Sequence, residues 1–193
     1  MPAVPATWRI KLIAQRLQAG AVIAYPTEGV WGLGCLPEFP EAVARILDLK
    51  QRSWEQGLIL VAGDIGEIAP YLTGIDRADR AELARTWPAP VTFLVPDNGI
   101  APTWIRGRHD KVALRVSPHP VIKAICAAVK GPIVSTSANP ARRRPAVSRL
   151  QVHQYFSDEI DYIVPGTLGD AGAPSEIREL GTGVIHRPAR ARQ

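Results

Sequence analysis

Short apolar runs alternate along this chain with longer segments whose apolar residues recur at helical spacing. The run at 21–25 has the length of a buried strand, whereas residues 8–19 place Ile10, Ile13 and Leu17 on one face of a helix. This alternation predicts an α/β protein, in which helices flank a sheet. Strands are expected at 21–25, 58–62, 91–95, 112–116, 132–136, 161–164 and 184–187, and helical segments at 8–19, 40–52, 65–72, 76–87, 121–129 and 148–156.

Capping and turn residues support several of these boundaries. We expect Thr7 to cap the first helix and Gly20 to end it. Pro40 suits the first turn of the second helix, and Ser148 can cap the last one. Residues 166–175 are rich in glycine and are predicted to form a loop between the last two strands.

The composition is that of a soluble globular domain. The chain has 193 residues, 46% hydrophobic and 21% charged, and can bury a core without disulfides or structural metal. We expect a single domain over residues 1–193. No apolar run approaches the ~20 residues of a membrane helix, and the first residues lack the order of a signal peptide. With only two cysteines, Cys35 and Cys126, the chain is predicted to be cytoplasmic and free of membrane contact.

The positive charge of the chain is concentrated in its second half. Residues 1–100 hold 9 basic and 11 acidic residues, and residues 101–193 hold 14 basic and 7 acidic residues. Eighteen of the 23 basic residues are arginine, whose planar donors match phosphate. This half therefore predicts a phosphate-bearing partner, either nucleotide or RNA. The alternative is a solvated basic face that only aids solubility.

Several common catalytic patterns are missing from the sequence. It has no GxxxxGK[ST] phosphate loop and no GxSxG nucleophile elbow. No metal-ligand spacing links the histidines and cysteines, so no protein metal site is expected. Each histidine is interpreted as a surface or packing residue: His109, His119, His153 and His186.

Small polar side chains follow predicted strands. Thr27 comes after the first strand, and Ser135, Ser137 and Asn139 lie where a later strand ends. In open α/β sheets ligands bind beyond the carboxyl ends of strands, and small hydroxyl and amide groups suit a nucleotide or amino-acid pocket. The alternative is that these residues only form turns and caps. Ser175, at the end of the Gly-rich loop, has the same two interpretations.

Four basic residues are candidates for binding an anion. Lys50 and Arg52 lie where a helix ends, so both could reach one anionic ligand, although cations also favour helix C-termini for dipole reasons. Arg115 lies inside an apolar strand and must be paired, either with a ligand carboxylate or in a structural salt bridge. Arg187 follows the last strand and could close a site over a ligand.

Seven segments form an ordered set along the chain: YPTEGVWGLGC at 25–35, KQR at 50–52, WPAPVTFLVP at 87–96, KVALRV at 111–116, HP at 119–120, PIVSTSANP at 132–140 and PSEIREL at 174–180. Together they resemble the YrdC/TsaC family of threonylcarbamoyl-AMP synthases, in its short, single-domain form. The resemblance implies a twisted, open mixed sheet flanked by helices, with a concave basic cavity.

The resemblance also implies an activity, that of an L-threonylcarbamoyladenylate synthase. Such a nucleotidyltransferase joins L-threonine, bicarbonate and ATP, with Mg²⁺ on the ATP, and releases pyrophosphate. A downstream threonylcarbamoyl transferase complex then modifies tRNA next to the anticodon, and direct contact with tRNA or double-stranded RNA is a further implied interaction. By residue, Thr27, Arg115, Ser135 and Ser175 would bind L-threonine, and Lys50, Arg52, Ser137, Asn139 and Arg187 would bind ATP, with Lys50 and Arg52 as the catalytic pair.

The implied chemistry agrees with the missing nucleophile motifs. Threonine and bicarbonate form a carbamate, which is itself the nucleophile that attacks the α-phosphate of ATP. The protein then has to supply positioning and charge stabilisation. Mg²⁺ would bridge phosphates and keep much of its water shell, so few protein ligands are expected.

The sequence departs from the family at two places. Where the family commonly has SANxSG, Asn139-Pro140 is followed here by Ala141-Arg142, and the proline that often follows the KxR motif is Ser53. These changes predict an altered loop over the nucleotide. The alternative function is a non-catalytic RNA-binding or ribosome-maturation module, and the least favoured is a carbamoyl-transfer domain of the hydrogenase-maturation type.

Overall fold

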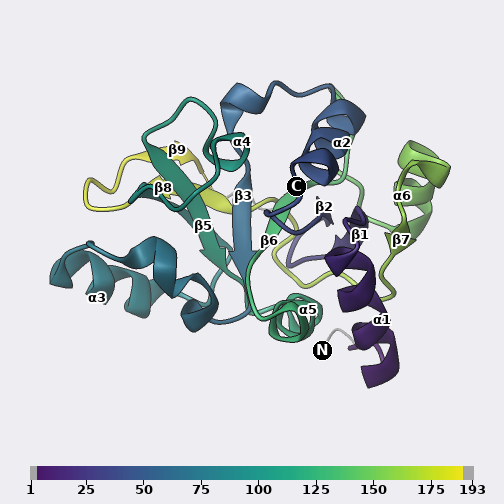
Figure 1. Cartoon of the computed structure of the whole chain (residues 1–193), viewed down its shortest axis with the longest axis horizontal. Helices are drawn as coiled ribbons and strands as arrows, with labels where there is room; N and C mark the ends of the chain where they lie inside the picture. The colour runs from purple at the N-terminus through teal and green to yellow at the C-terminus, as the bar shows by residue number, and fades with distance from the viewer. Residues whose placement is uncertain (1–3, 189–193) are drawn as a thin grey trace.

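The computed structural model describes residues 4–188 and contains one mixed sheet of nine strands (Figure 1). The strands lie in the order β7-β1-β2-β6-β3-β5-β4-β8-β9. Three neighbouring pairs are parallel, namely β1 with β7, β3 with β5 and β4 with β8. The strands are β1 (Ile23–Pro26), β2 (Trp31–Gly34), β3 (Ile59–Ala62), β4 (Val91–Pro96), β5 (Lys111–Val116), β6 (Ile133–Ser137), β7 (Tyr162–Ile163), β8 (Glu176–Glu179) and β9 (Ile185–Arg187).

Helices flank this sheet, which confirms the predicted α/β class. They are α1 (Thr7–Gln18), α2 (Pro40–Lys50), α3 (Arg77–Thr86), α4 (Thr103–Arg106), α5 (Pro120–Val129) and α6 (Arg149–Phe156), with the 3-10 helices η1 (Trp54–Gln56), η2 (Ile65–Leu72) and η3 (Ser157–Glu159). Pro70 lies inside η2 and cannot donate a backbone hydrogen bond, so this expected helix takes the tighter form. Between residues 4 and 188, no helix is both long and apolar enough to span a bilayer.

The two faces of the sheet pack against different helices, because alternate residues of a strand point in opposite directions. Ile23 of β1 and Val61 of β3 share a hydrophobic cluster with apolar residues of α1 and α5. The next residues along these strands, Ala24 and Ala62, belong to a second cluster that includes residues of α2 and α6. In Figure 1, α1 and α5 accordingly lie below the sheet and α2 lies above it.

Strand β2 lies where the sequence pattern predicts no strand. It contains Gly32 and Gly34, and glycine inside a strand is unfavourable unless another group approaches closely. Two groups approach Gly34, since a Cβ atom there would collide with the backbone oxygen of Val134 and lie 2.8 Å from Tyr25 Cε1. The contact with Tyr25 belongs to the β1–β2 pairing, in which Tyr25 faces Gly32. Strand β8 and helix α4 were likewise not predicted.

The predicted helix boundaries are mostly confirmed. Gly20 follows the end of α1 with a left-handed φ of 82°, and Pro40 is the first residue of α2. Ser148 caps α6 by accepting a hydrogen bond from the backbone N–H of Gln151. The predicted cap at Thr7 is wrong, because Ala6 is the N-cap residue and Thr7 is already helical.

Candidate active site

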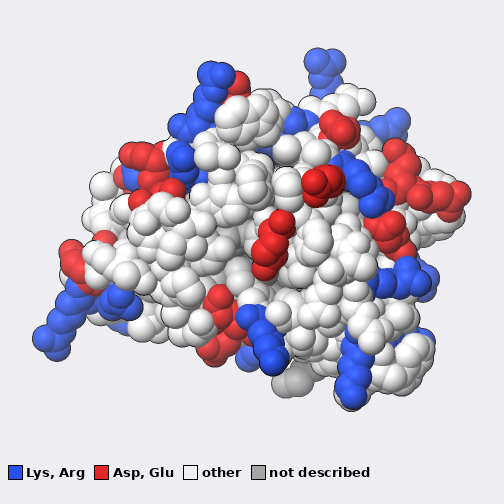
Figure 2. Space-filling model, viewed as in Figure 1, with Lys and Arg blue, Asp and Glu red and all other residues white. Residues whose placement is uncertain are grey.

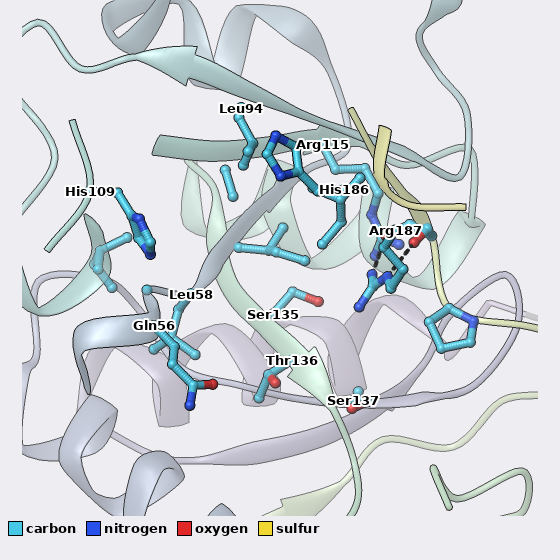
Figure 3. A pocket seen from close by; sticks show the side chains of 18 of the residues that line it. Gln56, Leu58, Leu94, His109, Arg115, Ser135, Thr136, Ser137, His186 and Arg187 are labelled. Carbon is cyan, nitrogen blue, oxygen red and sulfur yellow. Dashed lines mark hydrogen bonds between the residues drawn. The ribbon is translucent and has the colours of Figure 1, made fainter. Parts of the chain in front are cut away.

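A cavity of about 400 Å³ lies over the sheet face on which α1 and α5 pack (Figure 3). Its floor is a row of residues on four neighbouring strands. Ser135 of β6 pairs with Ile59 of β3, Ile59 pairs with Ala113 of β5, and Ala113 pairs with Leu94 of β4. All four line the cavity. The walls come from residues 52–58, α4, the end of the Gly-rich loop, β8 and β9.

The expectation that Ser135 follows the end of its strand is wrong. Strand β6 continues to Ser137 because it pairs with β2, where Ser137 faces Gly32. Ser135 and Arg115 therefore lie within their strands, and their side chains reach the cavity from the face of the sheet. The candidate site is thus a concave surface on the sheet, and its strand residues follow the two-residue period of the strands.

Most of the predicted site residues line this cavity. They are Thr27, Arg52, Arg115, Ser135, Ser137, Ser175 and Arg187. In Figure 3 the side chains of Arg115, Ser135 and Arg187 point toward the same space. Lys50 and Asn139 are not among the described residues that line it.

Lys50 instead supports the corner that follows β6. Its Nζ atom donates to the carbonyl oxygens of Ser137 at 2.5 Å and Asn139 at 3.0 Å. The Oδ1 atom of Asn139 accepts from the hydroxyl of Ser137 at 2.6 Å. Burial, with a smaller contribution from Arg52, lowers the pKa of Lys50 to about 8. Lys50, Ser137 and Asn139 therefore form one network, and only Ser137 reaches the cavity.

Three arginine side chains meet at the cavity: Arg52, Arg115 and Arg187. Burial lowers the pKa of Arg52 and, together with the charges of Arg115 and Arg52, lowers that of Arg187. Within residues 4–188 neither Arg52 nor Arg187 forms an ion pair. Like charges gathered in a partly dehydrated site favour the binding of an anion.

Arg115 forms the structural salt bridge that was one of the two alternatives, and it also faces the cavity. It lines the cavity, and it also forms an ion pair with Glu28, whose Oε2 atom lies 3.7 Å from its Nη1 atom. Both residues are buried, with exposed fractions of 6% and 7%. The pair is too long for a hydrogen bond, so the guanidinium retains donors for a ligand carboxylate.

Arg187 also holds Ser175 in place. Its Nε atom donates to the backbone oxygen of Ser175 at 2.9 Å, and its Nη2 atom donates to the hydroxyl at 3.2 Å. The Ser175 hydroxyl is also 2.9 Å from that of Thr92 on β4. The hydroxyl of Thr27, another lining residue, donates to the Val30 carbonyl at 2.7 Å. The hydroxyls of Ser175 and Thr27 are thus both held by contacts within the protein.

Several lining residues were not singled out from the sequence. Lys111 and Glu179 lie on β5 and β8 and form an ion pair at 2.6 Å. The alternation that contains Ala113 and Arg115 places Lys111 on the same face, so this residue was detectable from the pattern. His109 and His186, interpreted from the sequence as surface or packing residues, also line the cavity. No sequence signal identifies them, since their position depends on how distant segments meet.

The altered loop after β6 keeps the backbone conformation that glycine favours. Arg142 stands at the glycine position of the SANxSG pattern and has a left-handed φ of 61°. The Nδ2 atom of Asn139 donates to the carbonyl of the adjacent Arg143 at 2.9 Å. The loop is therefore held by the Asn139 side chain despite the loss of the glycine.

More basic than acidic side chains line the cavity. Basic residues are Arg52, Arg106, Lys111, Arg115 and Arg187, and acidic residues are Asp110 and Glu179. On the outer face in view, acidic and basic side chains are interspersed (Figure 2). In the described part of the chain, no group of three or more His, Cys, Asp or Glu side chains could hold a metal ion.

The fold and this cavity define an α/β protein with a cavity, lined by more basic than acidic residues, over the face of a mixed sheet. A family profile described as Sua5_yciO_yrdC, Telomere recombination, matches residues 15–189. The chain belongs to this Sua5/YciO/YrdC family.

Individual relatives agree with that assignment. The chain is 49% identical over 181 residues to the threonylcarbamoyl-AMP synthase of Cellvibrio japonicus, covering 94% of this chain and 96% of the relative. It is 51% identical over 180 residues to the protein of the same name from Marinobacter nauticus, covering 93% and 95%. The crystal structure of P. abyssi Sua5 complexed with L-threonine superposes with a TM-score of 0.89 at 28% identity, covering 96% of this chain and 55% of that one.

Proposed function

We propose that this chain is an L-threonylcarbamoyladenylate synthase. It joins L-threonine, bicarbonate and ATP, and it releases pyrophosphate. Threonine and bicarbonate condense to N-carboxythreonine with loss of water. A carbamate oxygen then attacks the α-phosphorus of ATP, and the bond between the α-phosphorus and the bridging oxygen breaks as pyrophosphate leaves. The enzyme is accordingly a nucleotidyltransferase.

The single observation that carries this proposal is the group of Arg52, Arg115 and Arg187 at one cavity. In the described chain the ion pairs of these three guanidinium groups amount to one, between Arg115 and Glu28 at 3.7 Å, so the group matches a ligand pair that brings a carboxylate and a polyphosphate. Relatives of about 50% identity named threonylcarbamoyl-AMP synthase, and a family structure holding L-threonine, support the same assignment.

In this proposal the two substrates occupy adjoining parts of the cavity. L-Threonine lies against Thr27, Arg115, Ser135 and Ser175, and ATP lies against Arg52, Ser137 and Arg187, with Lys50 and Asn139 supporting the nucleotide part. Arg52 stabilises negative charge that develops on the phosphates, as basic residues do in phosphoryl transfer generally. Mg²⁺ enters with ATP as part of the substrate and keeps most of its water shell.

The proposal also places the protein within tRNA modification. The adenylate passes to a downstream threonylcarbamoyl transferase complex in the cytoplasm, which modifies tRNA next to the anticodon. Direct contact with tRNA or double-stranded RNA is not needed for adenylate formation.

The test is an incubation of the purified chain with L-threonine, bicarbonate and Mg-ATP. We expect pyrophosphate release that requires both threonine and bicarbonate, with threonylcarbamoyl-AMP detected by mass. L-Serine and bicarbonate-free reactions are the substrate controls. Arg52→Ala should reduce product formation by at least a hundredfold while circular dichroism remains that of the wild type.

A folded wild-type protein that forms no adenylate would reject the proposed activity. RNA binding across a salt series would then be measured, because a steep loss of affinity with salt without ATP turnover is the behaviour of an RNA-binding module.

A further inference from the structure

Glu28 is a buried carboxylate whose two oxygens differ in their partners. Its Oε1 atom accepts a hydrogen bond from the hydroxyl of Ser117 at 2.6 Å. Its Oε2 atom is buried and has no hydrogen-bond partner within residues 4–188. The cation paired with Oε2 is Arg115, at 3.7 Å. A buried charge left at this distance is only partly compensated.

Arg115 also has a buried polar atom without a hydrogen-bond partner among the described residues. Its Nε atom is buried without a partner in the described part of the chain, and its charge adds to those of Arg52 and Arg187. Among the described residues, Glu28 is the one carboxylate paired with this arginine group. The carboxylate therefore offsets part of the cost of gathering three guanidinium groups at one cavity.

Glu28 is fixed by contacts that do not involve Arg115. The hydroxyl of Ser117 accepts from the backbone N–H of His119 at 3.0 Å, so its proton is directed to Glu28. The backbone oxygen of Glu28 accepts from Ala171 of the Gly-rich loop at 2.9 Å. These anchors keep the carboxylate from moving closer to Arg115 and forming a bidentate pair.

We propose that Glu28 is the resident counter-ion of Arg115 and sets how tightly the site binds a carboxylate. Held at 3.7 Å, it offsets the arginine charge but leaves guanidinium donors to the ligand. This inference rests on the proposed function, in which the ligand is L-threonine. Glu28 acts through Arg115 and is therefore a positioning residue.

L-Threonine and the adenylate share the same carboxylate, so Glu28 affects the binding of both. The carboxyl group of threonine is unchanged in the adenylate, so a charge that repels it weakens the binding of both. Binding a substrate and its product more tightly does not accelerate the chemical step. Glu28 thus lowers affinity for L-threonine and speeds release of the adenylate.

Glu28→Gln tests this role in the full chain, because glutamine keeps the shape and can still accept from Ser117. We expect the dissociation constant of L-threonine, measured by calorimetry, to fall about tenfold. The KM for threonine and kcat should fall together, while the KM for ATP stays within twofold of the wild type. Without ligand, the melting temperature should fall by about 5 °C or more, because Arg115 has lost its partner.

The double variant Glu28→Gln, Arg115→Gln separates this role from a general structural one. Removing both charges should make it more stable than Glu28→Gln alone, and its threonine affinity should equal that of Arg115→Gln. Glu67→Gln is the matched control. Glu67 accepts backbone hydrogen bonds from Gly63 and Asp64 away from the cavity, so its loss should lower stability without changing threonine affinity.

An unchanged or weaker threonine affinity in folded Glu28→Gln would overturn the inference, as would additive effects in the double variant. Failure of the proposed function is distinguishable from these results. A wild type that binds threonine without forming adenylate rejects the reaction but leaves the calorimetric test of Glu28 intact. A wild type that binds no threonine overturns both.

Discussion

Lys50 is buried, with an exposed fraction of 6%. It bonds to carbonyl oxygens of the corner that presents Ser137 to the cavity. Burial lowers its pKa from 10.5 to about 8, so the group is charged below that pH and neutral above it. Because the folded value lies below the unfolded one, the residue disfavours folding at low pH, and this penalty disappears as pH rises from about 8 to 10.5.

We predict that kcat/KM for ATP declines above pH 8 as Lys50 loses its proton, by about tenfold for each further pH unit. The physical reason is the loss of the positive charge that holds the corner presenting Ser137 to the cavity. Steady-state rates between pH 6.5 and 9.5 measure the decline. Lys50→Arg is the control, because arginine stays protonated and should remove the decline wherever this variant is active. A wild-type profile that stays flat to pH 9.5 would contradict the assignment.

At the scale of elements, the Gly-rich loop is held against the turn that follows β1. The backbone N–H groups of Gly169 and Ala171 donate to the carbonyls of Thr27 and Glu28. The approach is so close that a Cβ atom on Gly29 would collide with the backbone of Ala173. The same loop ends at Ser175, so its packing against this turn determines the position of the Ser175 hydroxyl.

Gly29→Ala should therefore displace the loop and raise the KM for L-threonine by at least tenfold, with a smaller effect on the KM for ATP. Steady-state kinetics with each substrate varied in turn measure the two KM values. Gly131→Ala is the matched control, because a Cβ atom there meets nothing within 4 Å. Equal KM values for threonine in the two variants would show that the loop does not position the site.

Local patterns predicted most elements, but they did not predict how elements meet. The amphipathic spacing of α1 and the apolar runs of β3 and β5 were sufficient to locate those elements. Strand β2 was missed because its glycines are explained by the close approach of the Tyr25 ring and the Val134 backbone, which only the folded chain brings there. The hydrogen bonds from Lys50 to the corner after β6 were not predictable either, because they join residues 87 or more positions apart in the sequence.

At the scale of the whole molecule, the protein keeps positive charges together in a cavity. Arg52 and Arg187 are partly dehydrated and have no ion-pair partner between residues 4 and 188. This arrangement raises the free energy of the folded state, and a polyphosphate bound there would lower it again.

ATP should therefore stabilise the fold markedly. At about 100 times its dissociation constant, the added stability is about 2.7 kcal/mol, which for a chain of this size raises the melting temperature by roughly 5–10 °C. Thermal denaturation with increasing ATP measures the shift, and adenosine is the control because it lacks phosphates. If adenosine raised the melting temperature as much as ATP, the phosphates would not be the group that these arginines recognise.

The walls of the cavity join Thr27, which follows β1, to Arg187 on β9. A ribosome therefore makes β1 to β8 before the residue that fixes Ser175 is available. A nascent chain has the floor of the cavity before it has this wall. Premature termination before β9 should thus leave a protein with much of its sheet but without a closed cavity, so the order of synthesis determines when the cavity can first close.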